Sequence, residues 1–225
     1  MKQGLGLGLG LAAVAGLLLG VAPARSASAA PDGYVARLEA EALLETLNAD
    51  LLSHDSATAV LQDWCDAHGP AGRHILAERV RGPDKPLPPA GRAALGAGVD
   101  QGLRYRRVRL TCGPQVLSEA DNWYLPARLT PQMNSTLDDS DTPFGVVVRP
   151  LDFHRRNLSA ALLFEPLPRG WETSASRTAP PLTAIPPQVL QHTAVLSTPA
   201  GAPFSYVVET YTGDALTMAL PGHGR

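Results

Sequence analysis

The sequence predicts an α+β domain, because helical patterns near its start are followed by several strand patterns. Leu44, Leu47 and Leu51 recur at the spacing of one helix face. Apolar and polar residues alternate over residues 103–111 and 204–211, which is typical of strands. With 225 residues and a formal net charge of −2, the chain is long enough for one domain with a substantial core. The balanced charge gives no indication of a nucleic-acid partner.

Residues 1–30 have the layout of a secretory signal peptide. Lys2 supplies a positive charge, residues 4–22 form an uncharged run dominated by Gly, Leu and Ala, and small residues close the segment. We expect cleavage after Ala29 or Ala30, which would export the rest of the chain to the periplasm or the medium. An uncleaved membrane anchor is the alternative, since the apolar run approaches spanning length. After cleavage, no stable membrane insertion is expected.

Cys65 and Cys112 are the two cysteines of the chain, and in an oxidising compartment they could form a disulfide. Such a bond would close a loop of roughly fifty residues and contribute about 4 kcal/mol in the chain-entropy model. Two buried free thiols are the alternative, and the sequence does not decide between them, because it does not show whether the cysteines are close in space.

Two helices are expected early in the exported chain. The first carries the leucine stripe, with three glutamates available for its solvent-facing side. The second begins at residues 54–58, where Asp55 or Ser56 can cap the free amides, and it ends at Gly69 and Pro70. The N-terminus of such a helix is also a seat for an anion.

The strand expected over residues 103–111 places one arginine on its apolar side. Arg106 shares a face with Val108 and Leu110, whereas Arg107 points to the other face. A charge on the apolar side is costly without a partner, so Arg106 is a candidate binding residue. The alternative is an edge position, where its aliphatic stem packs and its head reaches water.

A second candidate, Glu209, is the one acidic residue of the last apolar strand, where it shares a face with Val207 and Tyr211. A buried glutamate is costly without a partner, so we interpret it as functional or ion-paired. No CxxC, HExxH, GxSxG or Walker-type motif is present, and the six histidines show no ligand spacing. We therefore expect no metal site.

The other segments are polar, proline-rich or short, and their interpretation is correspondingly coarse. They are expected, in chain order, to form a strand (73–82), a Pro/Gly-rich connection (83–98), a polar strand with a bulge (116–125), a short helix (126–137), the turn DTPFG, a strand or helix start (145–150), a solvated segment DFHRRN, an apolar run (160–164), a Pro-rich loop (165–188), a closing hairpin (189–197 and 204–211) and a loose tail (213–225).

The order of these segments resembles the chorismate lyase family, also called chorismate–pyruvate lyase or 4-hydroxybenzoate synthase. The likeness runs from about residue 50 to residue 211 and rests on HDSATAVLQDW, RVRG, YRRVRL, SEADNWYLP, DTPFG and a final G-x-P-x(4)-V-E-x-Y strand. The resemblance implies an α+β fold in which helices cover an antiparallel sheet of about six strands. It also implies a small enclosed cavity that binds 4-hydroxybenzoate.

The resemblance further implies roles for particular residues. Arg106 would pair the ring carboxylate, with Arg107 as the alternative, and Glu209 would meet the oxygen at the opposite end of the ring. The backbone amides of Ala57 and Phe144 would complete the anion seat. The implied reaction eliminates pyruvate from chorismate and aromatises the ring, which requires orientation and one proton transfer but no cofactor.

Two functions are therefore expected. One is an exported chorismate lyase-like enzyme that acts on chorismate or on a related aromatic or enolpyruvyl acid. The other is a non-catalytic periplasmic binding module for small aromatic carboxylates, or an envelope protein that retains only the fold. The signal peptide speaks against the family's biosynthetic role, because chorismate is made and consumed in the cytoplasm. An effector domain of a transcription factor is disfavoured, since no DNA-binding segment is present. In either case we expect a monomer whose ligand is a small aromatic carboxylate.

Overall fold

The structure is a computed structural model that describes Met1, residues 33–96 and residues 102–220. Apart from Met1, the signal peptide expected over residues 1–30 lies outside the described residues, so it stays a prediction. The same holds for the last five residues of the expected tail.

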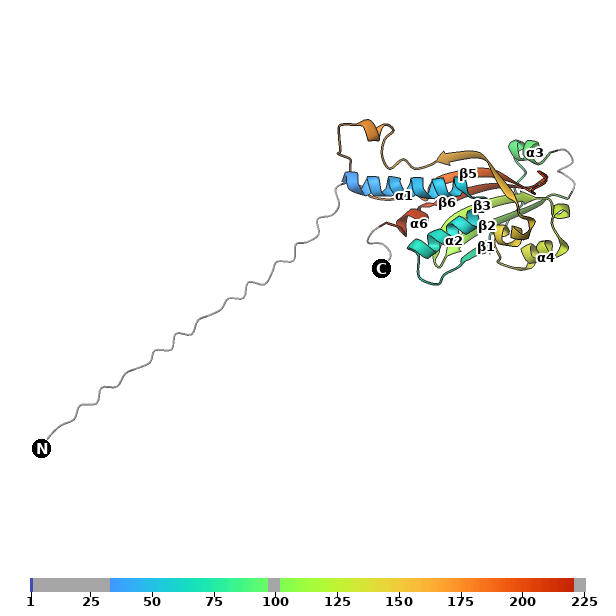
Figure 1. The fold of residues 1–225 in the computed structure, drawn as a ribbon, viewed down its shortest axis with the longest axis horizontal. Helices are drawn as coiled ribbons and strands as arrows, with labels where there is room; N and C mark the ends of the chain where they lie inside the picture. Colours follow the sequence, from blue (N-terminus) through green and yellow to red (C-terminus); the bar gives the residue numbers. More distant parts are fainter. Residues whose placement is uncertain (2–32, 97–101, 221–225) are drawn as a thin grey trace. The chain divides into compact units, whose positions relative to one another are not determined.

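Six strands pair antiparallel in one sheet, in the order β1-β2-β3-β6-β5-β4 (Figure 1). β1 to β3 follow one another as a first meander, β4 to β6 form a second, and pairing of β3 with β6 joins the two. The predicted α+β architecture with about six antiparallel strands is thereby confirmed. The strands are Ile75–Arg79 (β1), Arg104–Cys112 (β2), Gln115–Tyr124 (β3), His154–Leu162 (β4), Gln188–Ser197 (β5) and Pro203–Thr212 (β6).

Helices cover the sheet unequally. Of the α-helices in the described residues, five pack against the face that carries Arg106 and Glu209, and the other one, α3, packs against the opposite face beside Trp123 and Tyr206. Short 3-10 helices occur in the connections at Pro126–Arg128, Arg149–Leu151 and Trp171–Thr173. The α-helices are Gly33–Ser53 (α1), Ala57–His68 (α2), Pro89–Leu95 (α3), Pro131–Asp139 (α4), Phe144–Val147 (α5) and Gly213–Thr217 (α6).

The two N-terminal helices form as the sequence predicts. The leucine stripe of α1 is fully buried against the sheet, as expected for the apolar side of an amphipathic helix. α2 begins with Ser56 as its N-cap, because the Oγ of Ser56 accepts a hydrogen bond from the Ala59 amide at 3.2 Å. It stops at Gly69, whose amide donates to the carbonyl oxygen of Cys65 at 2.8 Å. In Figure 1 both helices are drawn over the sheet.

Cys65 and Cys112 form a disulfide, which joins α2 to the end of β2. Both residues are fully buried. The bond fastens the helix whose first turn faces the candidate site to the strand that carries Arg106. Gly69 lies close by, and a Cβ at that position would stand 2.6 Å from the Sγ of Cys112. A larger residue would therefore collide with the bridge.

The segment DFHRRN is only in part the solvated segment that we expected: Asp152, His154 and Arg156 are exposed, whereas Phe153 is buried. Its last four residues form the beginning of β4, an edge strand that pairs with β5 alone. Because an edge strand is covered on one side only, most residues of β4 are exposed and the apolar–polar alternation that marks a half-buried strand is weak. The exception is Arg155, whose side chain is buried.

One further segment differs from the prediction, and two agree with it. Residues after Gly213 were expected to be loose, but they form α6, which Trp64 holds by donating from Nε1 to the carbonyl oxygen of Ala215 at 2.8 Å. The bulge expected in residues 116–125 is confirmed, because the register moves from Ser118 to Val116 between Leu110 and Thr111 and leaves Leu117 of β3 unpaired. Residues 145–150 start a helix, which was one of the two expected forms.

The Pro-rich stretch between β4 and β5 has little regular structure, in agreement with its composition. It is nevertheless anchored, because Arg37 on α1 donates to the carbonyl oxygens of Pro166 and Pro180, each at 2.8 Å. Among the described residues, no helix combines the length and the apolar character needed to cross a membrane.

Candidate binding site

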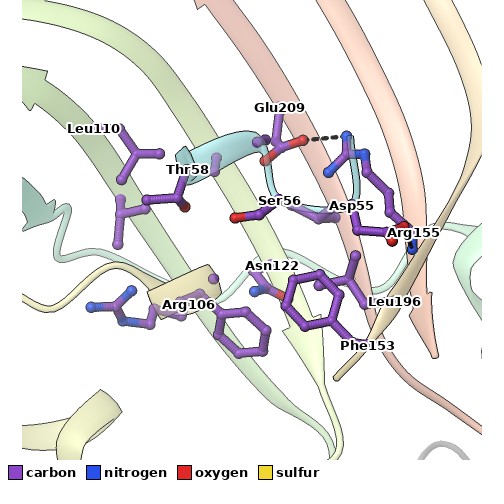
Figure 2. Close-up of a pocket in the computed structure, with 16 residues that line it drawn as sticks. Asp55, Ser56, Thr58, Arg106, Leu110, Asn122, Phe153, Arg155, Leu196 and Glu209 are labelled. Carbon is purple, nitrogen blue, oxygen red and sulfur yellow. Dashed lines mark hydrogen bonds and ion pairs between the residues drawn. The ribbon is translucent and has the colours of Figure 1, made fainter. Parts of the chain in front are cut away.

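A pocket lies between the sheet and the first turns of α2 and α5 (Figure 2). The empty space within it measures about 520 Å³, including the part that opens to solvent. Four residues singled out from the sequence line it, namely Arg106, Glu209, Ala57 and Phe144; Arg107 does not. The complete lining is Asp55, Ser56, Ala57, Thr58, Arg106, Val108, Leu110, Ala120, Asn122, Phe144, Gly145, Phe153, Arg155, Leu196, Val207 and Glu209.

Strand register explains why Arg106 and Glu209 reach the same pocket. Arg106 on β2 is opposite Asn122 on β3, which is opposite Val207 on β6. Glu209 is one step further along the same face of β6. The two residues are therefore two strands apart, about 10 Å across the sheet and about 7 Å along it. Their side chains can approach a small molecule from opposite sides.

Arg106 is a buried cation without a counter-ion among the described residues. It is 3 % exposed, and only its Nη2 has acceptors, the carbonyl oxygens of Ser140 at 3.5 Å and Thr142 at 3.3 Å. Its Nε and Nη1 are buried without any hydrogen-bond partner. Burial, reinforced by the nearby charge of Arg79, lowers the pKa of the Arg106 guanidinium. An unpaired buried charge is costly, so Arg106 is disposed to bind an anion.

Arg107 lies on the opposite face of β2 and is not a pocket residue. Its Nη2 donates to the Oε2 of Glu119 on β3 at 2.8 Å, and both side chains are about one third exposed. The hydrogen bond to Glu119 raises the pKa of Arg107. The parity of the strand thus selects Arg106, because successive side chains of a strand point to opposite faces.

Glu209 is paired with Arg155, a residue that sequence reasoning missed. Arg155 Nη2 donates to the Oε2 of Glu209 at 2.5 Å, and the two side chains are 2 % and 9 % exposed. The hydroxyl of Tyr211 also donates to this Oε2, at 3.3 Å. Burial alone lowers the pKa of Arg155, but the charge of Glu209, the neighbouring Tyr211 and the hydrogen bond to Glu209 outweigh it and raise the pKa. Arg155 is further oriented by Asn157, whose Oδ1 accepts from its Nε at 2.9 Å.

The start of β4 does contain a signal for Arg155. Phe153 and Arg155 are two residues apart and both line the pocket, whereas Arg156 is exposed. A period of two therefore places Phe153 and Arg155 on one face. The residues that flank them, Asp152, His154 and Arg156, are all polar, so the segment resembles a solvated loop. An alternation of two residues is also too short to indicate a strand.

The roof of the pocket consists of the beginnings of two helices that lie close together. A Cβ at Gly145 would stand 3.0 Å from the Oγ1 of Thr58 and 3.2 Å from the Oγ of Ser56, so glycine permits this approach. Ala57 and Phe144 occupy the first positions of their helices, where amides lack an intrahelical acceptor. The Phe144 ring packs against Tyr124 and Phe204, with ring centroids 5.4 and 6.5 Å apart.

The pocket is apolar in its middle and polar at its ends. Figure 2 shows Arg106 on one side and Arg155 on the other, with Asn122 and Phe153 between them. The Oδ1 of Asn122 accepts from the Oγ of Ser205 at 2.7 Å, which fixes the orientation of this amide. No described group of three or more His, Cys, Asp or Glu side chains could hold a metal ion. The arrangement suits a small molecule with an anionic group and an apolar body.

Comparison with known proteins identifies one clear relative. The sequence is 49 % identical over 196 residues to a protein of Sinorhizobium fredii (strain NBRC 101917 / NGR234) named uncharacterized protein y4mC, and the match covers 85 % of this chain and 82 % of the relative. No family model matches the sequence.

Solved structures resemble the chain only in part. The effector domain of PhnF from Mycobacterium smegmatis is 14 % identical, with 71 % of this chain and 90 % of that chain covered and a TM-score of 0.46. The gene product SA0254 of Staphylococcus aureus subsp. aureus N315 is 12 % identical, with 61 % and 83 % covered and a TM-score of 0.37. Likeness at this level says nothing about ligand or activity.

Proposed function

The chain belongs to the family of the Sinorhizobium fredii protein y4mC, and we propose that it is an exported protein that binds a small aromatic monocarboxylate in the pocket beside Arg106. The observation that carries this proposal is the buried guanidinium of Arg106, whose Nε and Nη1 have no partner. Burying an arginine without a counter-ion costs several kcal/mol. A carboxylate supplied by a ligand would offset this cost.

The rest of the pocket supports an aromatic body for the ligand. Phe153, Leu196 and Val207 line its centre, and aromatic rings bury well against such side chains. The distance across the sheet from Arg106 to Glu209 leaves room for one substituted ring between them. The free amides at the starts of α2 and α5 would add hydrogen bonds to the carboxylate near Arg106.

Isothermal titration calorimetry of the exported chain, from Pro31 onward, with benzoate and 4-hydroxybenzoate tests this proposal. The variant Arg106→Gln should weaken both ligands about tenfold to hundredfold, as expected for a lost charge-assisted hydrogen bond. Arg107→Gln is the matched control, because it removes the neighbouring arginine from the opposite face of β2. Absence of binding to the wild-type chain, or equal losses in the two variants, would contradict the proposal.

A second candidate function is the lyase reaction that the resemblance to chorismate lyases implies. It is favoured by one observation: four of the five residues to which the resemblance assigns roles line one pocket, and the fifth, Arg107, is the alternative to Arg106. Arg106 would hold the ring carboxylate, and Glu209 would lie near the hydroxyl at the opposite end of the ring, next to the ring carbon that loses the enolpyruvyl ether. Loss of the proton on the hydroxyl-bearing ring carbon and cleavage of the bond from the ring to the ether oxygen would leave 4-hydroxybenzoate, and the released enolpyruvate would take up a proton to become pyruvate.

Incubation with chorismate, followed by chromatography of 4-hydroxybenzoate and pyruvate, separates the two functions. Turnover that is abolished in both Arg106→Ala and Glu209→Ala, with the variants still folded, would establish the lyase reaction. Binding of 4-hydroxybenzoate that depends on Arg106, without turnover, would leave a binding protein.

Export is a proposal supported by the layout of residues 1–30. N-terminal sequencing of the protein recovered from the periplasm or the medium should begin at Ala30 or Pro31. Recovery of the chain in the cytoplasm with Met1 intact would refute export.

A further inference from the structure

We propose that Arg155 sets the charge selectivity of the pocket: by neutralising Glu209, it restricts the ligand to a monocarboxylate whose far end is uncharged. This inference rests on the proposed binding function, because it concerns the far end of the same pocket. It assigns a positioning role to an arginine outside the set that the sequence singled out.

The geometry makes the pairing of Arg155 with Glu209 specific. Arg155 is on edge strand β4, opposite Leu196 of β5, whereas Glu209 is on β6, opposite His192 of β5. The arginine therefore reaches across a whole strand and past Ala194, which is opposite Asn157 in the register. It reaches Glu209 at 2.5 Å with nearly complete burial of both side chains. Because Arg155 extends so far from its own strand and is buried together with Glu209, the two form an ion pair unlike those at a protein surface.

The buried charges of the pocket add up to one positive unit. Arg155 and Glu209 cancel each other, so the charge of Arg106 is left for the ligand. Asp55 also lines the pocket, but its side chain is 51 % exposed, so water screens it. Its Oδ1 is also engaged by the Arg155 amide at 2.6 Å. The pocket as it stands is complementary to a single negative charge.

Glu209 also decides what the far end of the ligand can be. Arg155 and Tyr211 both donate to its Oε2, and Oε1 remains as an acceptor at the pocket. A hydroxyl group on the ligand could donate to Oε1, whereas a second carboxylate would meet a like charge at close range. Removing the charge of Glu209 should free Arg155 to bind that second carboxylate.

The test measures the affinities of 4-hydroxybenzoate, benzoate and 4-carboxybenzoate for four forms of the exported chain. These forms are the wild type, Glu209→Gln, the double variant Arg155→Gln/Glu209→Gln and the control Arg156→Gln, which removes the exposed neighbouring arginine on β4. In the wild type and the control, 4-hydroxybenzoate should bind at least about a hundredfold tighter than 4-carboxybenzoate. The affinity of Glu209→Gln for 4-carboxybenzoate should be about tenfold or more above that of the wild type. The double variant should lose this gain.

Benzoate distinguishes a failure of the proposed binding function from a failure of the role of Arg155, because its binding needs Arg106 and not the far end of the pocket. If benzoate binds but Glu209→Gln rejects 4-carboxybenzoate as strongly as the wild type does, only the role of Arg155 is overturned. The same conclusion follows if the double variant keeps the gain. If the wild type binds none of the three acids, the proposed function and this inference both fail.

Glu209→Gln leaves Arg155 buried without a partner and can therefore be unstable. Refolding this variant in the presence of each acid then gives the same test. At equal concentrations the dicarboxylate should rescue folding more strongly than benzoate, because it alone also pairs with Arg155, whereas equal effects of the two acids would overturn the inference.

Discussion

Removal of the disulfide should destabilise the protein far more than the lost packing of its two buried sulfur atoms alone would. Cys65 and Cys112 are 47 residues apart in the chain, and the loop that they close is free in the unfolded state once the bond is absent. The chain-entropy model gives about 4 kcal/mol for a loop of this length. For a domain of this size, 1 kcal/mol corresponds to about 2–4 °C, so the melting temperature should fall by about 8–16 °C.

Urea denaturation of the wild type, Cys65→Ala, Cys112→Ala and the double variant measures this effect. Either single substitution breaks the bond, so each should lose nearly as much stability as the double variant. A reducing agent should lower the wild-type midpoint toward that of the variants and leave the variants unchanged. The loop-entropy explanation would be refuted if the stability losses of the two single variants added up to the loss of the double variant. It would also be refuted if the reducing agent did not shift the wild-type midpoint.

Three other substitutions give independent tests. Trp64→Phe removes the indole donor from the buried carbonyl of Ala215 and should cost about 1–3 kcal/mol in urea denaturation; an unchanged midpoint would contradict this. Burial, with the charge of Arg155 adding to it, lowers the pKa of His192 from 6.5 to about 4. Between pH 6.5 and pH 4 the unfolded state therefore binds more protons than the folded state, and the stability of the fold decreases as the pH drops. His192→Gln should therefore recover about 2 kcal/mol of the loss between pH 7 and pH 5, and equal pH slopes in wild type and variant would show that His192 is not responsible. Arg37→Ala should release residues 163–187 from α1 and speed their cleavage by trypsin without lowering the melting temperature much; an unchanged cleavage rate would mean that other contacts hold this segment.

Much of the fold could be predicted because its main elements are strongly patterned. The buried stripe of α1 and the Ser56 cap of α2 are local features that a sequence displays directly. The alternation in β2 assigned Arg106 to the covered face, and the same parity placed Glu209 on the covered face of β6. These side chains could be found because each is the exception within an otherwise regular apolar pattern.

What the sequence concealed depends on contacts between distant segments. Arg155 is on an edge strand with little alternation, and its burial results from reaching Glu209 across β5. α6 is short, and Trp64 from α2 holds it in place. The proximity of Cys65 and Cys112 depends on how α2 packs against the end of β2. None of these contacts follows from local spacing.

The joining of the two meanders through β3 and β6 has a consequence for folding. The chain between these strands contains α4, α5, β4 and β5, so their pairing closes a long loop and is slow and entropically costly. Arg106 and Asn122 belong to the first meander, and Glu209 and Arg155 to the second. A molecule held between these residues would bridge the seam between the two meanders. Its binding would therefore slow their separation and make the lifetime of the native state depend on the concentration of its ligand.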